Sequence, residues 1–123
     1  VAQMRDPTSP AADAAFSQGY MLYKGEGVES DPVQAARWLR MAAERDHGSA
    51  QLFFAFLLEN GEGVEKDVME AAMWYELAAA KEIADAREAA DRLRDRMDGQ
   101  ECAELDRKVA HWRPDQPLPD ISR

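Results

Sequence analysis

Residues 25–43 read GEGVESDPVQAARWLRMAA, and residues 61–79 read GEGVEKDVMEAAMWYELAA. The two stretches share glycines, an aspartate, a tryptophan and alanines at an offset of 36 residues. The repeated structural positions are Gly25 with Gly61, Gly27 with Gly63, Asp31 with Asp67, and Trp38 with Trp74. A fixed period of this size is typical of solenoids, in which each unit stacks on its neighbours. A solenoid presents an extended surface, so the repeat favours a binding function over a reaction pocket.

Each repeat carries signals that begin and end helices. Asp31 and Asp67 are expected N-caps, and Glu70 completes a capping-box pattern with Asp67. Gly25 and Gly61 are expected to end the preceding helices, because glycine adopts the left-handed conformation without strain. No segment alternates with period two, so no strand is expected. The sequence predicts six helices in three antiparallel hairpins, at about 10–24, 32–45, 49–60, 68–81, 84–97 and 98–111.

The predicted fold is all-α, a right-handed superhelical solenoid of antiparallel helix hairpins. Ser49 is expected to cap the third helix and Asp98 the sixth. Three prolines break any helix after about residue 113. The expected divisions are a loose leader at 1–9, a solenoid at 10–113 with repeats 14–49 and 50–85 and a degenerate capping hairpin at 86–113, and an extended tail at 114–123. The charged third unit suits the end of a solenoid, which must face water.

Composition excludes several classes of protein. The formal net charge is −9, which argues against nucleic acid and anionic membrane surfaces as partners, because both require basic patches. The acidic charge serves solubility alone, or it also favours basic or neutral partners; both interpretations stay open. No run of about 18 apolar residues predicts a membrane-inserted helix. The single cysteine, Cys102, excludes an internal disulfide and a four-thiolate zinc site. The chain starts at Val1, so a signal peptide preceding it would not be visible.

The order of helix, Gly-x-Gly-Val and Asp-x-x-x-Ala-x-x-Trp-x-x-x-Ala-Ala resembles the Sel1-like repeat, a relative of the tetratricopeptide repeat. Residues 14–43 and 50–79 match it closely, and residues 86–113 match only as a cap. The resemblance implies a bacterial, non-enzymatic scaffold or regulator for protein partners. Many members are periplasmic, secreted or associated with the envelope. We therefore expect a periplasmic or secreted protein, with the cytoplasm as the alternative, and a monomer in preference to a self-associating structural protein.

Aromatic side chains that do not repeat are the best candidates for a binding surface. In tetratricopeptide-like solenoids the first helix of each hairpin lines the concave face. The residues expected to bind a partner peptide or helix there are Tyr20, Tyr23, Phe53 and Phe56 as an aromatic strip, with Gln51, Glu59 and Asn60 as its polar rim. Aromatic anchors with a polar rim are typical of peptide-binding surfaces. The alternative is that these rings only pack on neighbouring helices or on the proline-containing tail.

The sequence predicts no catalytic residue, metal ligand or cofactor. His47 and His111 are the only histidines, and neither lies in a metal-binding or nucleophilic motif. The glycines at 25, 27, 61 and 63 lack the following Lys-Ser/Thr of a phosphate-binding loop. A hydrolase of the β-lactamase-like kind remains the enzymatic alternative, because cysteine-rich members of the family have been linked to that activity. Their paired cysteines are absent here. The tail from Arg113 to Pro119 is either a disordered end or an extended ligand for another domain.

Overall fold

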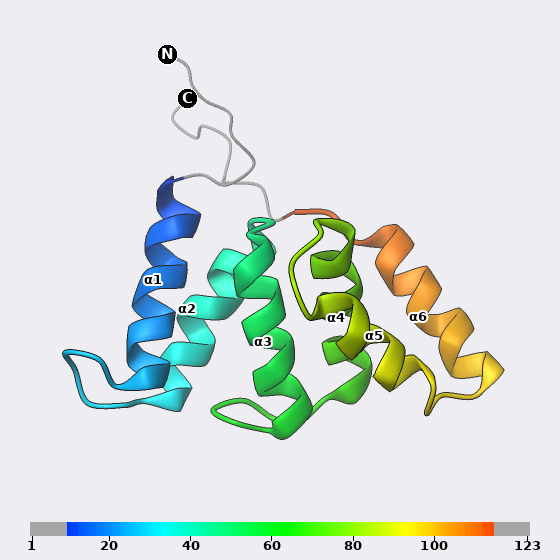
Figure 1. The fold of residues 1–123 in the computed structure, drawn as a ribbon, viewed down its shortest axis with the longest axis horizontal. Helices are drawn as coiled ribbons and strands as arrows, with labels where there is room; N and C mark the ends of the chain where they lie inside the picture. Colours follow the sequence, from blue (N-terminus) through cyan, green and yellow to red (C-terminus); the bar gives the residue numbers. More distant parts are fainter. Residues whose placement is uncertain (1–9, 115–123) are drawn as a thin grey trace, which may run out of the picture.

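The computed structural model describes residues 10–114, which form six α-helices and, within that range, no β-strand. The helices are α1 (Pro10–Lys24), α2 (Pro32–Glu44), α3 (Gly48–Asn60), α4 (Val68–Ala80), α5 (Ala86–Arg94) and α6 (Gly99–His111) (Figure 1). The all-helical prediction is confirmed. The predicted leader at 1–9 and the tail from residue 115 lie outside the described residues.

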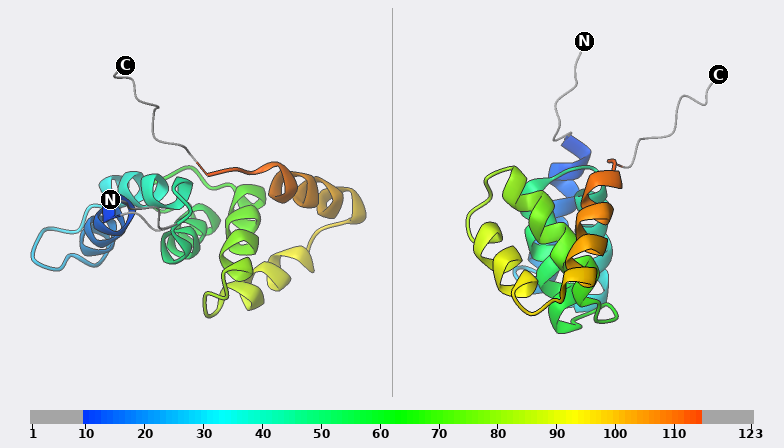
Figure 2. Two further views of the ribbon diagram at one scale, coloured as in Figure 1. Left: turned by 90° about the horizontal axis from the view of Figure 1, so that it is seen from above. Right: turned by 90° about the vertical axis from the view of Figure 1, so that its right-hand side faces the viewer.

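The helices stack as successive pairs. α1 packs on α2, α3 packs on α4, and α2 packs against α3 and thereby joins the first two pairs. Figure 2 shows α1, α3 and α5 toward one face of the molecule, with α2 and α6 toward the other. The first helices of the three pairs therefore share one face, as the resemblance implies.

The C-terminal pair is more open than the other two. α5 and α6 each pack on α4 and make few contacts with one another. α5 buries Ala86, Ala90 and Leu93, and α6 buries Leu105. Because α5 and α6 have little apolar surface to bury against one another, both helices pack on α4 instead. This open arrangement agrees with the degenerate sequence of the third unit.

Two predicted helix starts are wrong. The side chain of His47 caps α3 by accepting a hydrogen bond from the backbone N–H of Ala50 at 3.1 Å, so Ser49 lies inside the first turn. α5 begins after Asp85 and ends at residue 94, whereas the prediction was 84–97. The φ angle of Asp85 is 72°, which lies outside the right-handed helical region and prevents an earlier start.

Aspartate caps hold three helix starts, as predicted. The capping residues are Asp31, Asp67 and Asp98. The carboxylate of Asp67 accepts a hydrogen bond from the backbone N–H of Glu70 at 3.0 Å. The carboxylate of Glu70 does not return to the cap but accepts a hydrogen bond from Trp74 Nε1 at 3.1 Å. The predicted capping box is therefore half formed at Asp67, whereas at Asp98 both of its hydrogen bonds to Glu101 are present.

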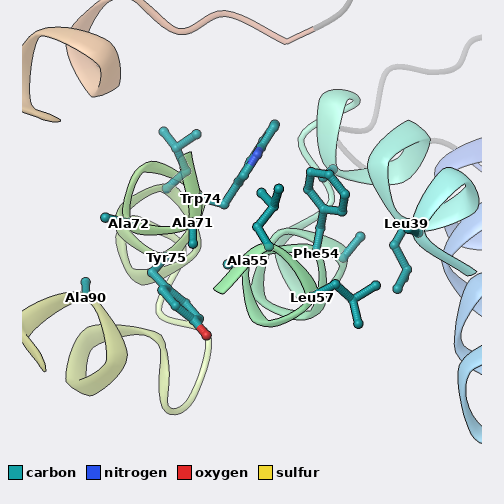
Figure 3. Packing of buried hydrophobic residues seen from close by; sticks show 14 of the residues in the cluster. Leu39, Phe54, Ala55, Leu57, Ala71, Ala72, Trp74, Tyr75 and Ala90 are labelled. Carbon is teal, nitrogen blue, oxygen red and sulfur yellow. The ribbon is translucent and has the colours of Figure 1, made fainter. Parts of the chain in front are cut away.

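The centre of the core lies between α3 and α4. The rings of Phe54 and Trp74 meet edge to face with their centroids 6.0 Å apart (Figure 3). Trp112, which follows α6, also meets Trp74 edge to face, at 5.8 Å. Fully buried alanines, among them Ala55, Ala71 and Ala72, line the facing helix surfaces. Small side chains let the helices approach, and Trp74 fills the remaining space. Trp38, its equivalent in the first repeat, packs against the core but is only partly buried.

The loop between α3 and α4 makes a close contact with the start of α2 in the first repeat. Gly63 lies so close to the start of α2 that a Cβ atom there would overlap the carbonyl group of Pro32 and lie 2.9 Å from the nitrogen of Val33. Its φ angle is 71°. Gly27, the equivalent in the first repeat, has a φ of 76°, but a Cβ there would meet nothing within 4 Å in the described part of the chain. In the first repeat the glycine at this position is required only by the turn. In the second repeat Gly63 is required by the turn and also by the close approach of the loop to α2.

We expect Gly63→Ala to lower the melting temperature far more than Gly27→Ala. Both changes place a side chain at positive φ, which costs about 1–2 kcal/mol. Only Gly63→Ala also forces a methyl group against the backbone of the neighbouring repeat. Thermal unfolding followed by circular dichroism measures the difference, and equal losses in the two variants would contradict the close contact between the loop and α2.

Candidate functional site

A groove lies on the face shared by the first helices, between α1 and α5 with α3 as its floor. Its volume is about 620 Å³. α3 contributes Leu52, Phe53 and Phe56 to the lining, and α1 contributes Tyr23. A surface hollow lined by apolar and aromatic side chains is the usual form of a site that buries another molecule.

The opposite wall comes from α4 and α5. Tyr75 reaches the groove from α4, and the start and exposed side of α5 add Asp85, Glu88, Ala89 and Arg92. The sequence does not predict this wall, because the charge of the third unit also suits a solubilising cap. The available signal was the spacing of the charged residues at i, i+3 and i+7, which places them on one side of a helix.

The predicted aromatic strip lies on the groove face, but only three of its four residues line the groove. These are Tyr23, Phe53 and Phe56. Tyr20 packs beside the groove, with its ring edge to face against Phe53 at a centroid distance of 5.5 Å. Phe53 also contacts Phe16 at 5.9 Å and is partly buried. Phe56 is different, because 41% of its surface remains exposed. Packing on neighbouring helices therefore covers much of the surface of Phe53, whereas a large part of the surface of Phe56 stays exposed.

None of the three residues of the predicted polar rim lines the groove. Gln51 is 0% exposed, and its amide donates to the carbonyl of Ala43 at 3.2 Å, so its assignment to an open rim is wrong. Its equivalent in the first repeat is Ala15, and both positions face the interior of the stack. Asn60 is exposed at the end of α3, where its amide donates to the carbonyl of Phe56 at 3.0 Å. It does not line the groove. Glu59 accepts hydrogen bonds from Tyr75 and Arg92, which do line the groove.

Glu59 joins three helices at the edge of the groove. Its carboxylate accepts a hydrogen bond from the hydroxyl of Tyr75 on α4 at 2.8 Å. It also accepts two from the guanidinium of Arg92 on α5, at 2.5 and 3.4 Å. The Glu59 side chain is only 16% exposed, whereas that of Arg92 is 45% exposed. This network fixes the distance between the floor of the groove and its α5 wall.

The hydrogen bonds of this network shift the pKa values of Glu59 and Tyr75. The hydrogen bond from Arg92 lowers the pKa of Glu59 below its ordinary value of 4.5, although burial acts in the opposite direction. Burial, together with the hydrogen bond to Glu59, raises the pKa of the Tyr75 hydroxyl. At neutral pH Glu59 is therefore ionised and Tyr75 is neutral. The positive charge of Arg92 is matched within the protein and is not free to attract an anion.

The two histidines have local structural contacts. His47 is buried between helices, with Nε2 at 3.1 Å from a carboxylate oxygen of Asp13 and its ring stacked on Phe16 at 4.8 Å. His111 is exposed, with Nδ1 at 2.8 Å from the carbonyl oxygen of Arg107. Within residues 10–114, no three His, Cys, Asp or Glu side chains are grouped so that they could hold a metal ion. None of the helices in this range is long and apolar enough to span a bilayer.

The sequence also matches a known repeat. A family model described as the Sel1 repeat matches residues 12–47 and 48–82, which together make up more than half of the chain. The two matched segments correspond to α1 with α2 and to α3 with α4. No curated protein matches the sequence.

Two solved bacterial structures are similar to this chain. One is a protective antigen of uropathogenic Escherichia coli strains that displays an SLR fold; it has a TM-score of 0.76 and 26% sequence identity, over 82% of this chain and 22% of that protein. The other is a Sel1 repeat protein from Oxalobacter formigenes, with a TM-score of 0.65 and 29% identity, over 80% of this chain and 42% of that protein. The chain thus spans less than half the length of either structure.

We expect Glu59→Gln to destabilise the protein in a pH-dependent way. The folded-state pKa of Glu59 is below the unfolded value, so the ionised carboxylate stabilises the fold above about pH 4.5, and this contribution is lost as the pH falls through the folded-state pKa. Because Arg92 is partly exposed, the loss at neutral pH should be about 1 kcal/mol. Urea unfolding from about pH 7 down to about pH 3 measures it. The control Glu29→Gln changes an exposed residue, and its free energy of unfolding should follow that of the wild type across this range. If the free energy lost in Glu59→Gln were the same at every pH, the stabilising role of the ionised Glu59 carboxylate would be contradicted.

Proposed function

This chain belongs to the Sel1 repeat family, and we propose that it is a binding module whose groove between α1, α3 and α5 holds an apolar segment of a partner protein. Sel1 repeats are protein interaction modules and are typically not catalytic. The occupant of the groove is a peptide segment or a helix of the partner. We assign the protein the role of a scaffold or regulator that works by holding its partner.

The exposure of Phe56 is the observation that carries this proposal. Phe56 lies on a helix that packs tightly elsewhere, yet 41% of its surface stays exposed in the lining of the groove. Burying such a ring against a partner is favourable, because about 25 cal/mol is gained for each square ångström of apolar surface removed from water. Aromatic side chains in hollows are also the residues that contribute most to binding energy.

The position of the groove floor is fixed by packing, which supports the same function. Phe53 is held between Phe16 and Tyr20. Arg92 is held by Glu59 on the other side. A floor whose side chains are already positioned loses little conformational entropy when a partner binds, and this preorganisation increases affinity.

The location of the protein is also a proposal. We place it in the periplasm or outside the cell, as for many bacterial proteins with such repeats. The similar E. coli protein is described as a protective antigen, which fits a protein accessible to the host. Fractionation of the native host with an antibody to this chain tests the placement. Recovery in the cytoplasm alone would contradict it.

Selection from a phage-displayed library of random 12-residue peptides tests the function. We expect the wild-type protein to enrich peptides and Phe56→Glu to bind them at least about tenfold more weakly, since an anchoring aromatic residue contributes about 2 kcal/mol or more. The matched control is Val33→Glu, because Val33 is 50% exposed on α2 and lies outside the groove lining. Circular dichroism verifies that both variants fold. Equal binding by Phe56→Glu and Val33→Glu, or no enrichment by the wild type, would refute the proposed function.

A further inference from the structure

The charges on the α5 wall of the groove are unevenly paired. Each arginine of α5 forms an ion pair with a glutamate on another helix: Arg87 and Arg94 with Glu76, and Arg92 with Glu59. By contrast, Glu88 forms no ion pair with any residue between 10 and 114, and neither does Asp85. Both line the groove and both are exposed. The charge that this wall offers to an incoming molecule is therefore negative.

The unpaired acids lie next to the apolar floor. Asp85 and Glu88 are three residues apart at the start of α5, which places their side chains within reach of a single cationic group. On the opposite side, the negative charge of Glu62 acts on the hydroxyl of Tyr23. The single lysine of α1, Lys24, lies over the ring of Tyr20 with Nζ 6.0 Å from the ring centroid. Tyr20 does not line the groove, so this positive charge lies beside the groove and not in it.

We propose that the segment held in this groove is basic as well as apolar: a lysine or arginine of the partner lies against Asp85 and Glu88, and a neighbouring large apolar side chain lies against Phe56. This proposal rests on the proposed function and names the chemistry of the partner. The lining of the groove also contains aromatic rings, whose faces attract positive charge.

An acidic segment fits the same groove poorly. It would have to draw Arg92 away from Glu59 and leave that carboxylate, which is only 16% exposed, without its ion-pair partner. Removing one partner of a partly buried charge pair costs more than an exposed pair contributes. The net charge of −9 acts in the same direction, because it attracts basic partners over a distance and repels acidic ones.

The composition of peptides selected by the wild-type protein is the first test. We expect Lys and Arg to be enriched next to Leu, Ile, Phe or Trp, compared with the unselected library. The variant Glu88→Lys places a lysine three residues from Asp85 and should lose this enrichment. Selected peptides with no excess of Lys or Arg would overturn the charge proposal while leaving an apolar groove in place. No enrichment at all would overturn the proposed function and this inference together.

Titration of the most enriched peptide against a pair of matched variants is the second test. Asp85→Asn with Glu88→Gln removes both groove acids, and asparagine tolerates the positive φ of residue 85. Glu29→Gln with Glu104→Gln removes two exposed acids that do not line the groove. We expect the first double variant to bind about threefold to tenfold more weakly than the second, with a smaller dependence on salt. Equal affinities in the two double variants, with Phe56→Glu still defective, would reject the basic partner and retain the groove.

Discussion

The stacking of one helix pair on the next is the constraint on which the rest of this structure depends. A single pair cannot bury its apolar surface, so α3 and α4 must be covered by α2 on one side and by α5 and α6 on the other. Alanines that are completely buried permit this close approach, and Trp74 fills the space they leave. The groove follows from the same constraint, because pairs that stack in one direction bring α1, α3 and α5 to one face. The site is thus a product of the repeat.

The sequence was sufficient for the parts of the fold that depend on local chemistry. Asp31 and Asp67 cap their helices because a carboxylate three residues from a free N–H needs no help from the rest of the chain. The 36-residue offset specified which residues are equivalent, and hence which helices share a face. It could not specify where equivalent residues differ in burial. Trp38 and Trp74 occupy the same position in the repeat, yet Trp74 is buried and packs edge to face on Phe54 and Trp112, whereas Trp38 is only partly buried.

The errors at the site have a common physical cause. Gln51 is polar, so it was placed at the rim, but its side chain finds hydrogen-bond partners inside the stack at Ala43 and Asp46. Charged residues of α5 were assigned to solubility, but Arg92 forms a network with Glu59 on a helix 33 residues away in sequence. In both cases the partner lies on another helix or loop, and periodicity carries no information about it. The aromatic residues were easier to identify, because Phe53 and Phe56 depart from Ser17 and Tyr20 at equivalent positions.

The way in which α5 is attached has a consequence for the motions of the molecule. This helix has nine residues and three buried side chains, too few turns to be stable without its neighbours. It is held to the second repeat by α4 and by ion pairs whose arginines are partly exposed. Local opening should therefore begin in the C-terminal pair that contains α5, while the Phe54–Trp74 contact stays closed. A molecule that contacts both α3 and α5 binds only while α5 is in place, and it therefore stabilises the closed state. Amide hydrogen exchange in residues 86–94 should then slow more than exchange in the other helices.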